Sequence, residues 1–235
     1  MVLNEVMTAL AALGSEQIRK LLARHGAPQN HFGVKIGDMK PLVKRIKVDQ
    51  TLALALWETG NSDARYLAGL IAAPASFTRE QLQHWAETAD WSMLSEYAVA
   101  WCAAESPFGW ELGRCWIDSP VERVACAGWA TLASLVGVMP DEHLDLPALR
   151  DLLRRVRDTL HGSPNRLRYV MNGFVLAVGG CVAPLTQEAL AVAASLGKVK
   201  VDMSGTACRT PDVAAYINKM RQRGALGKKR KSARC

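Results

Sequence analysis

The sequence of 235 residues lacks the short motifs that mark most enzyme classes. It contains no GxSxG elbow, no GxGxxG, no HExxH and no P-loop, and the late "GALGKKRKS" has a Gly-Lys pair without P-loop glycine spacing. These absences exclude most hydrolases, kinases and dehydrogenases. Only five histidines occur, none at ligand spacing to another, and the six cysteines form no CxxC pair. We therefore expect neither a metal nor a cofactor.

Long hydrophobic runs are also missing. The longest uncharged stretches, "VACAGWATLASLVGVM" and "YVMNGFVLAVGGCVAPL", are shorter than the ~18 apolar residues of a membrane span, and the second carries Asn172. Both predict buried helices, so no membrane contact is expected. No basic-then-apolar leader opens the chain, and the scattered cysteines are typical of reduced thiols. These features predict a cytoplasmic protein.

Acidic residues are absent from the last fifteen positions, which hold seven of the 29 Lys and Arg residues. The rest of the chain has 22 basic and 22 acidic residues, so the net charge of +7 belongs to this end. We predict one domain over 1–220 and a basic tail over 221–235. Such a tail is typical of a solvated terminus and equally of a phosphate-binding segment.

Nearly every segment has helical periodicity. Residues 3–24 place apolar side chains at the 3-to-4 spacing of an amphipathic helix. Only "GKVKVDM" alternates as a strand would, and it is equally compatible with a loop. For the segment 201–212 we predict only a loop and a helix start. The fold class is predicted to be all-α.

Three segments share one plan: a helix end, a short polar turn, an arginine and an apolar helix rich in small residues. They are residues 56–72, 115–133 and 159–178, with Arg65, Arg123 and Arg168, and residues 84–104 fit the same slot without the arginine. Helical hairpins of this kind gain stability by stacking. We predict an α-solenoid of HEAT-like repeats, with a generic helical bundle as the alternative.

The repeated arginines stand at helix starts, where a positive charge opposes the helix dipole. An internal acceptor or an external phosphate would offset this, and both possibilities stay open. If the helices are equivalent, the arginines line one groove.

Tryptophan is concentrated in one region. Six of the seven tryptophans lie between positions 85 and 129, interleaved with carboxylates. A cleft lined by aromatic rings and a carboxylate suits a flat cationic ligand. Most of these rings are expected in the core. Trp91 follows Asp90 at a helix start, where its side chain can face a groove.

The segments "HFGVKIGDMKPLVKRI", "LWETGNSDARYLAGLI", "DWSMLSEYAV" and "VERVACAGWATLASL" resemble successive parts of the AlkD-type DNA alkylation-repair family. The likeness runs from about residue 30 to 180, and residues 197–235 resemble the ending of one branch. It implies a HEAT-like solenoid that holds double-stranded DNA on a basic surface. Its glycosylase members remove cationic N3- or N7-alkylated purines without a cofactor.

Carried over by position, the resemblance is partial. Trp91 matches the first lesion-flanking tryptophan, and Arg123 matches the backbone-gripping arginine. Ser95 stands where the family has its aspartate, with Glu96 one position later, and Phe174 takes the place of the second tryptophan. One residue turns an α-helix by about 100°, so Glu96 is not expected to replace the aspartate.

Three functions remain open: an alkylpurine DNA glycosylase, a non-catalytic binder of distorted or branched DNA, and a peptide-binding scaffold. The catalytic candidates are Trp91, Ser95, Glu96 and Phe174. The predicted phosphate contacts are Arg65, Arg123, Arg166, Arg168, Lys228, Lys229, Arg230 and Lys231. DNA affinity is then expected to fall steeply with salt and to drop further when residues 226–235 are removed.

Overall fold

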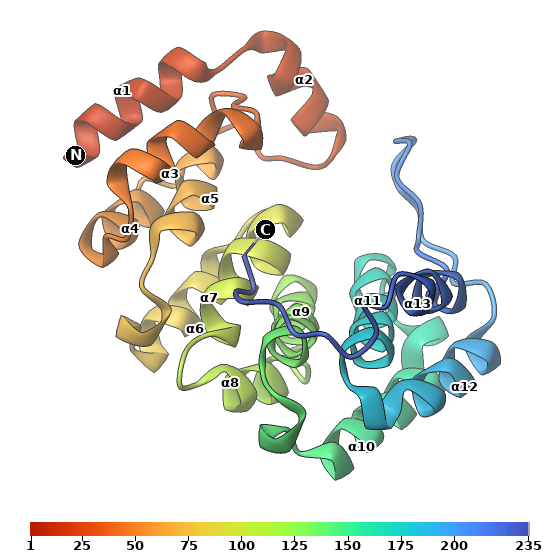
Figure 1. Ribbon diagram of the computed structural model, residues 1–235. Coiled ribbons are helices and arrows are strands. Elements are labelled where there is room, and N and C mark those ends of the chain that lie inside the picture. Colours follow the sequence, from red (N-terminus) through yellow and green to blue (C-terminus); the bar gives the residue numbers. More distant parts are fainter. Residues whose placement is uncertain (235) are drawn as a thin grey trace.

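The computed structural model describes residues 1–234, and over these residues it contains helices and no strand (Figure 1). The prediction of an all-α fold is confirmed. The α-helices are α1 (Leu3–Leu13), α2 (Glu16–Arg24), α3 (Lys40–Ile46), α4 (Gln50–Glu58), α5 (Ser62–Ile71), α6 (Arg79–Thr88), α7 (Ala100–Ala104), α8 (Gly109–Trp116), α9 (Glu122–Val138), α10 (Leu146–Thr159), α11 (Asn165–Cys181), α12 (Thr186–Leu196) and α13 (Val213–Gln222). A π-helix, η3 (Leu94–Val99), leads directly into α7. Short 3₁₀ turns lie at Ile36–Met39, Pro74–Ser76, Asp141–His143, Leu160–Gly162 and Ala183–Leu185.

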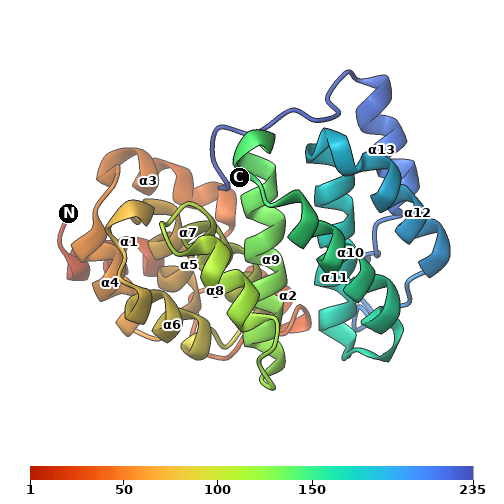
Figure 2. The same ribbon diagram turned by 90° about the horizontal axis from the view of Figure 1, so that it is seen from below.

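The helical hairpins stack along an arc, and their first and second helices form two rows that lie side by side (Figures 1 and 2). The A row consists of α4, α6, α8, α10 and α12. The B row consists of α5, η3 with α7, α9, α11 and α13, and each member packs against the next. This arrangement is an α-solenoid, because each hairpin buries its apolar face against its neighbours.

Many helices begin at polar turn residues, at the breaks in the sequence where helix starts were predicted. In six cases the side chain of the residue before the helix accepts a hydrogen bond from a first-turn N–H group, which satisfies a donor without an intrahelical partner. These caps are Ser15 for α2, Asp49 for α4, Asn61 for α5, Thr78 for α6, Asp145 for α10 and Asp212 for α13.

The N-terminal helices are anchored to the B row by a buried carboxylate. Asp63, in the first turn of α5, accepts hydrogen bonds from the backbone N–H groups of Phe32 at 2.7 Å, Gly33 at 3.0 Å and Val34 at 3.3 Å. Burial raises the pKa of Asp63, and the three N–H donors oppose that shift. The anchor fixes the segment that follows α2.

Most tryptophans are core residues, as predicted. Trp57 stacks on Trp85 with ring centroids 4.1 Å apart. Trp129 meets Phe174 edge to face at 5.1 Å, and Phe174 is fully buried. The prediction that Phe174 lines a lesion site is therefore wrong, because its ring fills the contact between α9 and α11.

Helix α9 approaches α8 so closely that one position has no room for a side chain. A Cβ atom on Gly128 would lie 2.7 Å from the backbone N of Ile117 and 2.9 Å from the carbonyl oxygen of Gly113. On α11, by contrast, a Cβ atom on Gly173 would meet nothing within 4 Å.

We expect Gly128→Ala to lower the free energy of unfolding by about 1–3 kcal/mol, because the two helices must move apart. The matched Gly173→Ala exchange should raise it by about 0.5–1 kcal/mol, through helix propensity alone. Urea unfolding of both variants measures the pair. Unchanged stability of Gly128→Ala would contradict the close packing of α8 on α9.

The end of the chain is bound to the fold. After α13 the chain returns across the B row toward α9 and α7 (Figures 1 and 2). We call residues 226–234 the C-terminal strap. Its donors reach backbone carbonyls at the C-terminal ends of three helices. At α11, Gly227 N donates to Gly180 O at 2.8 Å, and at α9, Lys229 Nζ donates to Val136 O and Arg230 N to Gly137 O at 2.8 Å each. At the end of α5, the Arg234 guanidinium donates to Leu70 O at 3.1 Å and to Ala72 O at 2.7 Å. Ser232 and the Ala233 amide also donate to Glu105, after α7.

The strap changes the interpretation of the basic tail. Lys229 also pairs with Asp141 at 2.7 Å, and only 17% of its side chain is exposed. Its ammonium group and the backbone N–H of Arg230 satisfy orphan carbonyls at the end of α9, where a cation also favours the helix dipole. The prediction that Lys229 binds phosphate is therefore wrong. Lys228, Arg230 and Lys231 are exposed, and their contact with DNA stays a prediction.

Three further features concern the described residues. Within residues 1–234 no single helix is long and apolar enough to cross a membrane, although the bent pair Asn165–Cys181 and Ala183–Leu196, with 114° between its parts, passes that test together. No group of three or more His, Cys, Asp or Glu side chains in the same residues is arranged to hold a metal ion. The "GKVKVDM" segment is a loop.

Candidate functional site

A cavity of about 120 Å³ lies where the N-terminal ends of η3, α9 and α11 meet. The B-row helices run in the same direction, so this cavity is at the opposite edge of the row from the strap. Since α9 and α11 have 17 residues each, the two edges are about 25 Å apart. The cavity is lined by Asp90, Trp91, Ser92, Ser95, Glu96, Glu122, Arg123, Cys126 and Arg166.

The structure brings together five of the predicted site residues: Trp91, Ser95, Glu96, Arg123 and Arg166 all line the cavity. Arg65 reaches it indirectly, by pairing with Asp90 at 3.2 Å. Arg168 does not line it and faces a different cavity beside α12.

The Trp91 side chain is buried and hydrogen-bonded to the protein. Its indole Nε1–H donates to the carbonyl oxygen of His25 at 2.9 Å, and the residue is only 7% exposed. His25 directly follows α2, so the Asp63 anchor that fixes the following loop also helps to place the indole. The sequence contains no signal for this contact, because the acceptor is a backbone carbonyl 66 positions away.

Ser95 and Glu96 lie in the π-helix η3. The Ser95 hydroxyl donates to the carbonyl oxygens of Trp91 and Ser92, at 3.4 Å each. Glu96 lines the same cavity, although α-helical geometry predicts that it points elsewhere. The wider π turn, with hydrogen bonds from i to i+5, rotates each residue by less than an α turn does and keeps both side chains on one side.

Glu96 forms a bidentate ion pair with Arg166 across the cavity. Both hydrogen bonds, from Nε and from one terminal nitrogen, measure 2.5 Å. The side chains are 5% and 33% exposed, respectively. Burial raises the pKa of Glu96 and the bonds from Arg166 oppose this, while the carboxylate raises the pKa of Arg166. The short, paired contacts indicate that both groups are ionised.

The other two carboxylates of the cavity also have partners. Asp90 pairs with Arg65. Glu122 accepts the backbone N–H of Arg166 at 3.0 Å, at the start of α11, where a negative charge complements the helix dipole. Every carboxylate that lines the cavity is thus committed to a donor of the protein itself.

Arg65 and Arg123 bind the carbonyl ends of A-row helices. Arg65 donates to Trp57 O at 3.0 Å and Thr88 O at 2.9 Å, and its side chain is only 12% exposed. Arg123 donates twice to Glu87 O, at 3.2 and 3.0 Å, and remains exposed. The sequence left open whether these arginines bind an acceptor inside the protein or an external phosphate. The structure contains the internal acceptor for both.

Cys126 is the remaining reactive group in the cavity. Burial raises the pKa of its thiol, and the neighbouring Glu96 carboxylate raises it further. The thiol is therefore protonated at neutral pH and lacks the thiolate that a nucleophile requires.

Comparison with known proteins identifies relatives that share this fold. The sequence profile of the family described as DNA alkylation repair enzyme matches residues 6–105. A solved structure from "a new family of proteins related to the HEAT-like repeat DNA glycosylases with affinity for branched DNA structures" superposes over 100% of both chains, with a TM-score of 0.91 and 37% identity. The chain belongs to this family of proteins related to the HEAT-like repeat DNA glycosylases. The HEAT-like solenoid predicted from the repeats is confirmed.

Curated relatives from two species share the full length. Uncharacterized proteins of Listeria monocytogenes and Listeria innocua are each 34% identical over 227 residues, which is 94% of this chain and 97% of theirs. The likeness to the solved structure covers 100% of this chain, so it extends beyond the region from 30 to 180 in which the sequence motifs resemble the family, and it includes α1 and α2.

The sequence missed three contributors to the site: the His25 carbonyl, the helix-capping Glu122 and the pairing of Glu96 with Arg166. Only the last had a usable signal, since an acid and an arginine both sit at starts of B-row helices. Their separation of 70 residues hid it.

Proposed function

We propose that this protein binds branched DNA and does not excise bases. The ion pair between Glu96 and Arg166 carries the proposal, because it removes the charge that base excision needs. The structural relative with affinity for branched DNA supports the ligand, since it matches the whole chain at 37% identity.

Cleavage of a glycosidic bond develops positive charge on the sugar, and a preorganised anion in the site stabilises it. In this cavity Glu96 already neutralises a guanidinium, Asp90 pairs with Arg65 and Glu122 caps α11. Ser95 offers a hydroxyl whose hydrogen is given to backbone carbonyls. A sugar cation would find no unpaired carboxylate among these groups.

Binding would use the N-terminal edge of the B row. There the helix dipoles of α9 and α11 present partial positive charge, and N–H groups of helix starts favour phosphate. Arg123 is exposed at this edge and donates only to one carbonyl, so it can also reach a phosphate. The pairing of Arg65 and Arg166 within the protein leaves Arg123 as the principal side-chain contact.

Fluorescence anisotropy with a four-way junction and a linear duplex of matched length tests this function. We expect tighter binding to the junction than to the duplex. Arg123→Ala should reduce the magnitude of the negative slope of log affinity against log salt by about 0.9, which corresponds to the loss of one phosphate contact. Arg114→Ala, which removes an exposed arginine of α8, is the matched control and should leave the slope unchanged. Equal affinity for junction and duplex would contradict the preference for branches and leave double-stranded DNA as the ligand.

A second assay measures chemistry. Methylated duplex DNA should release no free base in the presence of the protein. Release that disappears in a Trp91→Ala variant would instead establish an alkylpurine DNA glycosylase. The cytoplasmic location expected from the sequence stays a prediction, which fractionation of cells would test.

A further inference from the structure

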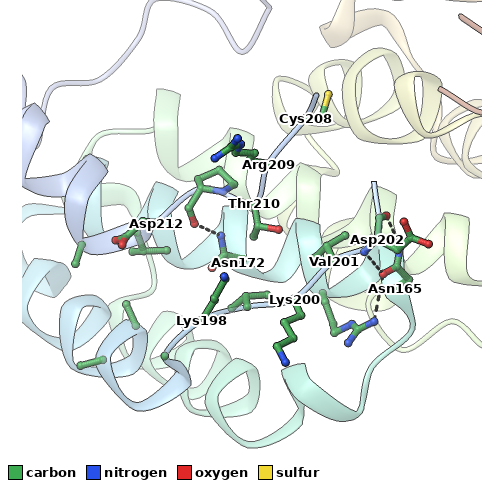
Figure 3. Close-up of a pocket in the computed structure, with 18 residues that line it drawn as sticks. Asn165, Asn172, Lys198, Lys200, Val201, Asp202, Cys208, Arg209, Thr210 and Asp212 are labelled. Carbon is green, nitrogen blue, oxygen red and sulfur yellow. Dashed lines mark hydrogen bonds between the residues drawn. The ribbon is translucent and has the colours of Figure 1, made fainter. Parts of the chain in front are cut away.

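A second and larger cavity lies at the far end of the solenoid. It measures about 880 Å³ and is enclosed by α11, α12, the loop 197–212 and the start of α13 (Figure 3). Its size falls in the range of about 300–1,000 Å³ that is typical of small-molecule sites. The segment 201–212, for which the sequence indicated no role, forms part of its wall.

Basic side chains dominate the charge of this cavity. Arg168, Lys198 and Arg209 line it, and Figure 3 shows Lys198 reaching toward Asn172. Within residues 1–234, no carboxylate forms an ion pair with any of these three cations. Lys200 also lines the cavity but points away from its centre in Figure 3.

The two acids of the wall are already occupied by the backbone. Asp212 accepts the N–H of Ala215 at 2.9 Å as the cap of α13, and Asp202 accepts the N–H of Ser204 at 2.8 Å. They hold the loop and the helix start, and they do not neutralise the cations. The cavity is therefore electropositive.

Arg168 carries an unsatisfied donor. Its Nε is buried and has no hydrogen-bond partner, while its terminal nitrogen donates to Asn165 Oδ1 at 3.2 Å. Asn165 also fixes the backbone of Asp202, at 2.9 and 2.8 Å. The guanidinium is thus positioned by the wall, and a buried N–H without an acceptor is what a bound anion would satisfy.

The N-terminus of α13 adds a second kind of anion contact. Val213 and Ala214 line the cavity in the first turn of this helix of ten residues. The Asp212 cap satisfies the N–H of Ala215, so the two preceding N–H groups are available. Val199, Val201 and Pro211 complete an apolar wall.

We propose that this cavity binds an organic phosphate of nucleotide size, with the phosphate between Arg168, Lys198 and the start of α13. Arg209 contributes charge from the opposite loop. The apolar wall receives the organic part. The same chemistry is available from a free nucleotide and from an unpaired nucleotide of a DNA strand, and these two sources are separable by experiment.

Isothermal titration calorimetry of the full-length chain tests the site with adenosine 5′-monophosphate, adenosine and an oligothymidylate single strand. We expect the mononucleotide to bind and adenosine to fail, since the cations recognise the phosphate. Lys198→Glu combined with Arg209→Glu should weaken binding about a hundredfold, from about tenfold for each lost charged hydrogen bond. Lys219→Glu, at an exposed position in the last turn of α13, is the matched control.

The outcomes are distinct. Binding of the single strand alone, lost in the double variant, supports the site and assigns its phosphate to DNA. Binding of neither probe, or equal affinities for the double variant and Lys219→Glu, overturns the proposal. Should the double variant unfold, Lys198→Gln alone must weaken binding about tenfold. Junction affinity in Arg123→Ala is measured separately, so failure at one site leaves the other interpretable.

Discussion

Arg166→Ala should lower the free energy of unfolding by about 3–5 kcal/mol at neutral pH, because it strands the Glu96 carboxylate. That carboxylate is 5% exposed and has both of its oxygens bound to Arg166. Without the guanidinium, the variant must either keep a buried charge or fold with Glu96 protonated. Chemical unfolding followed by circular dichroism measures the loss.

The loss should depend on pH in a stated direction. Burial already raises the pKa of Glu96, and removal of the opposing Arg166 raises it further. A carboxyl with a raised folded-state pKa stabilises the fold below its unfolded pKa of about 4.3, and this stability disappears as the pH rises through the folded pKa. The deficit of Arg166→Ala against the wild type should therefore be small near that lower pH and grow toward neutrality.

A double variant provides the control. Arg166→Ala with Glu96→Gln removes the buried charge, so its deficit at neutral pH should be smaller than that of Arg166→Ala alone and should not grow in the same way toward neutrality. A single variant whose deficit is independent of pH would show that Glu96 remains solvated in solution. That result would contradict the sequestered carboxylate on which the proposed function depends.

Removal of residues 226–235 should lower the free energy of unfolding by about 5 kcal/mol, as measured by urea unfolding followed by circular dichroism. The strap makes hydrogen bonds at the ends of α5, α9 and α11, each with a net value of about 0.5–1.5 kcal/mol, or about 1.5–3 kcal/mol from a charged donor. It lies at the edge of the B row opposite to Arg123, so it cannot share a phosphate with that residue.

Point variants separate the two roles of the tail. Arg234→Ala should reproduce about 1.5–3 kcal/mol of the loss, since its guanidinium serves two carbonyls of α5. Lys228→Ala with Lys231→Ala removes two exposed charges and should leave stability unchanged. A different result would contradict the strap. If the Lys228 and Lys231 variant weakens DNA binding and removal of residues 226–235 leaves the free energy of unfolding unchanged, the tail acts as a phosphate contact and not as a strap.

The sequence predicted those features that depend on local pattern. Apolar spacing identified the helices, polar turns marked their starts, and the shared plan around Arg65, Arg123 and Arg168 identified the repeats. Each of these signals lies within one or two helical turns. The cavity around Trp91 was also anticipated, because a family resemblance supplied the positions that meet there.

The errors share a different cause. Phe174 and Lys229 were assigned by residue type, but their roles depend on contacts between distant segments: a ring on α9 in one case and a carbonyl at the end of α9 in the other. A basic side chain that caps a helix has the same composition as one that binds phosphate. The π turn at Glu96 likewise leaves no mark in the local periodicity.

The strap has a consequence for the order of synthesis. Repeats of a solenoid fold through contacts between neighbours, so the N-terminal hairpins can form while the chain is still being made. The contact of Arg234 with Leu70 joins positions 164 residues apart, so it forms only after the strap has been synthesised and has left the ribosome. The strap therefore binds after the hairpins have formed, and a chain that stops before the strap presents open carbonyls at three helices.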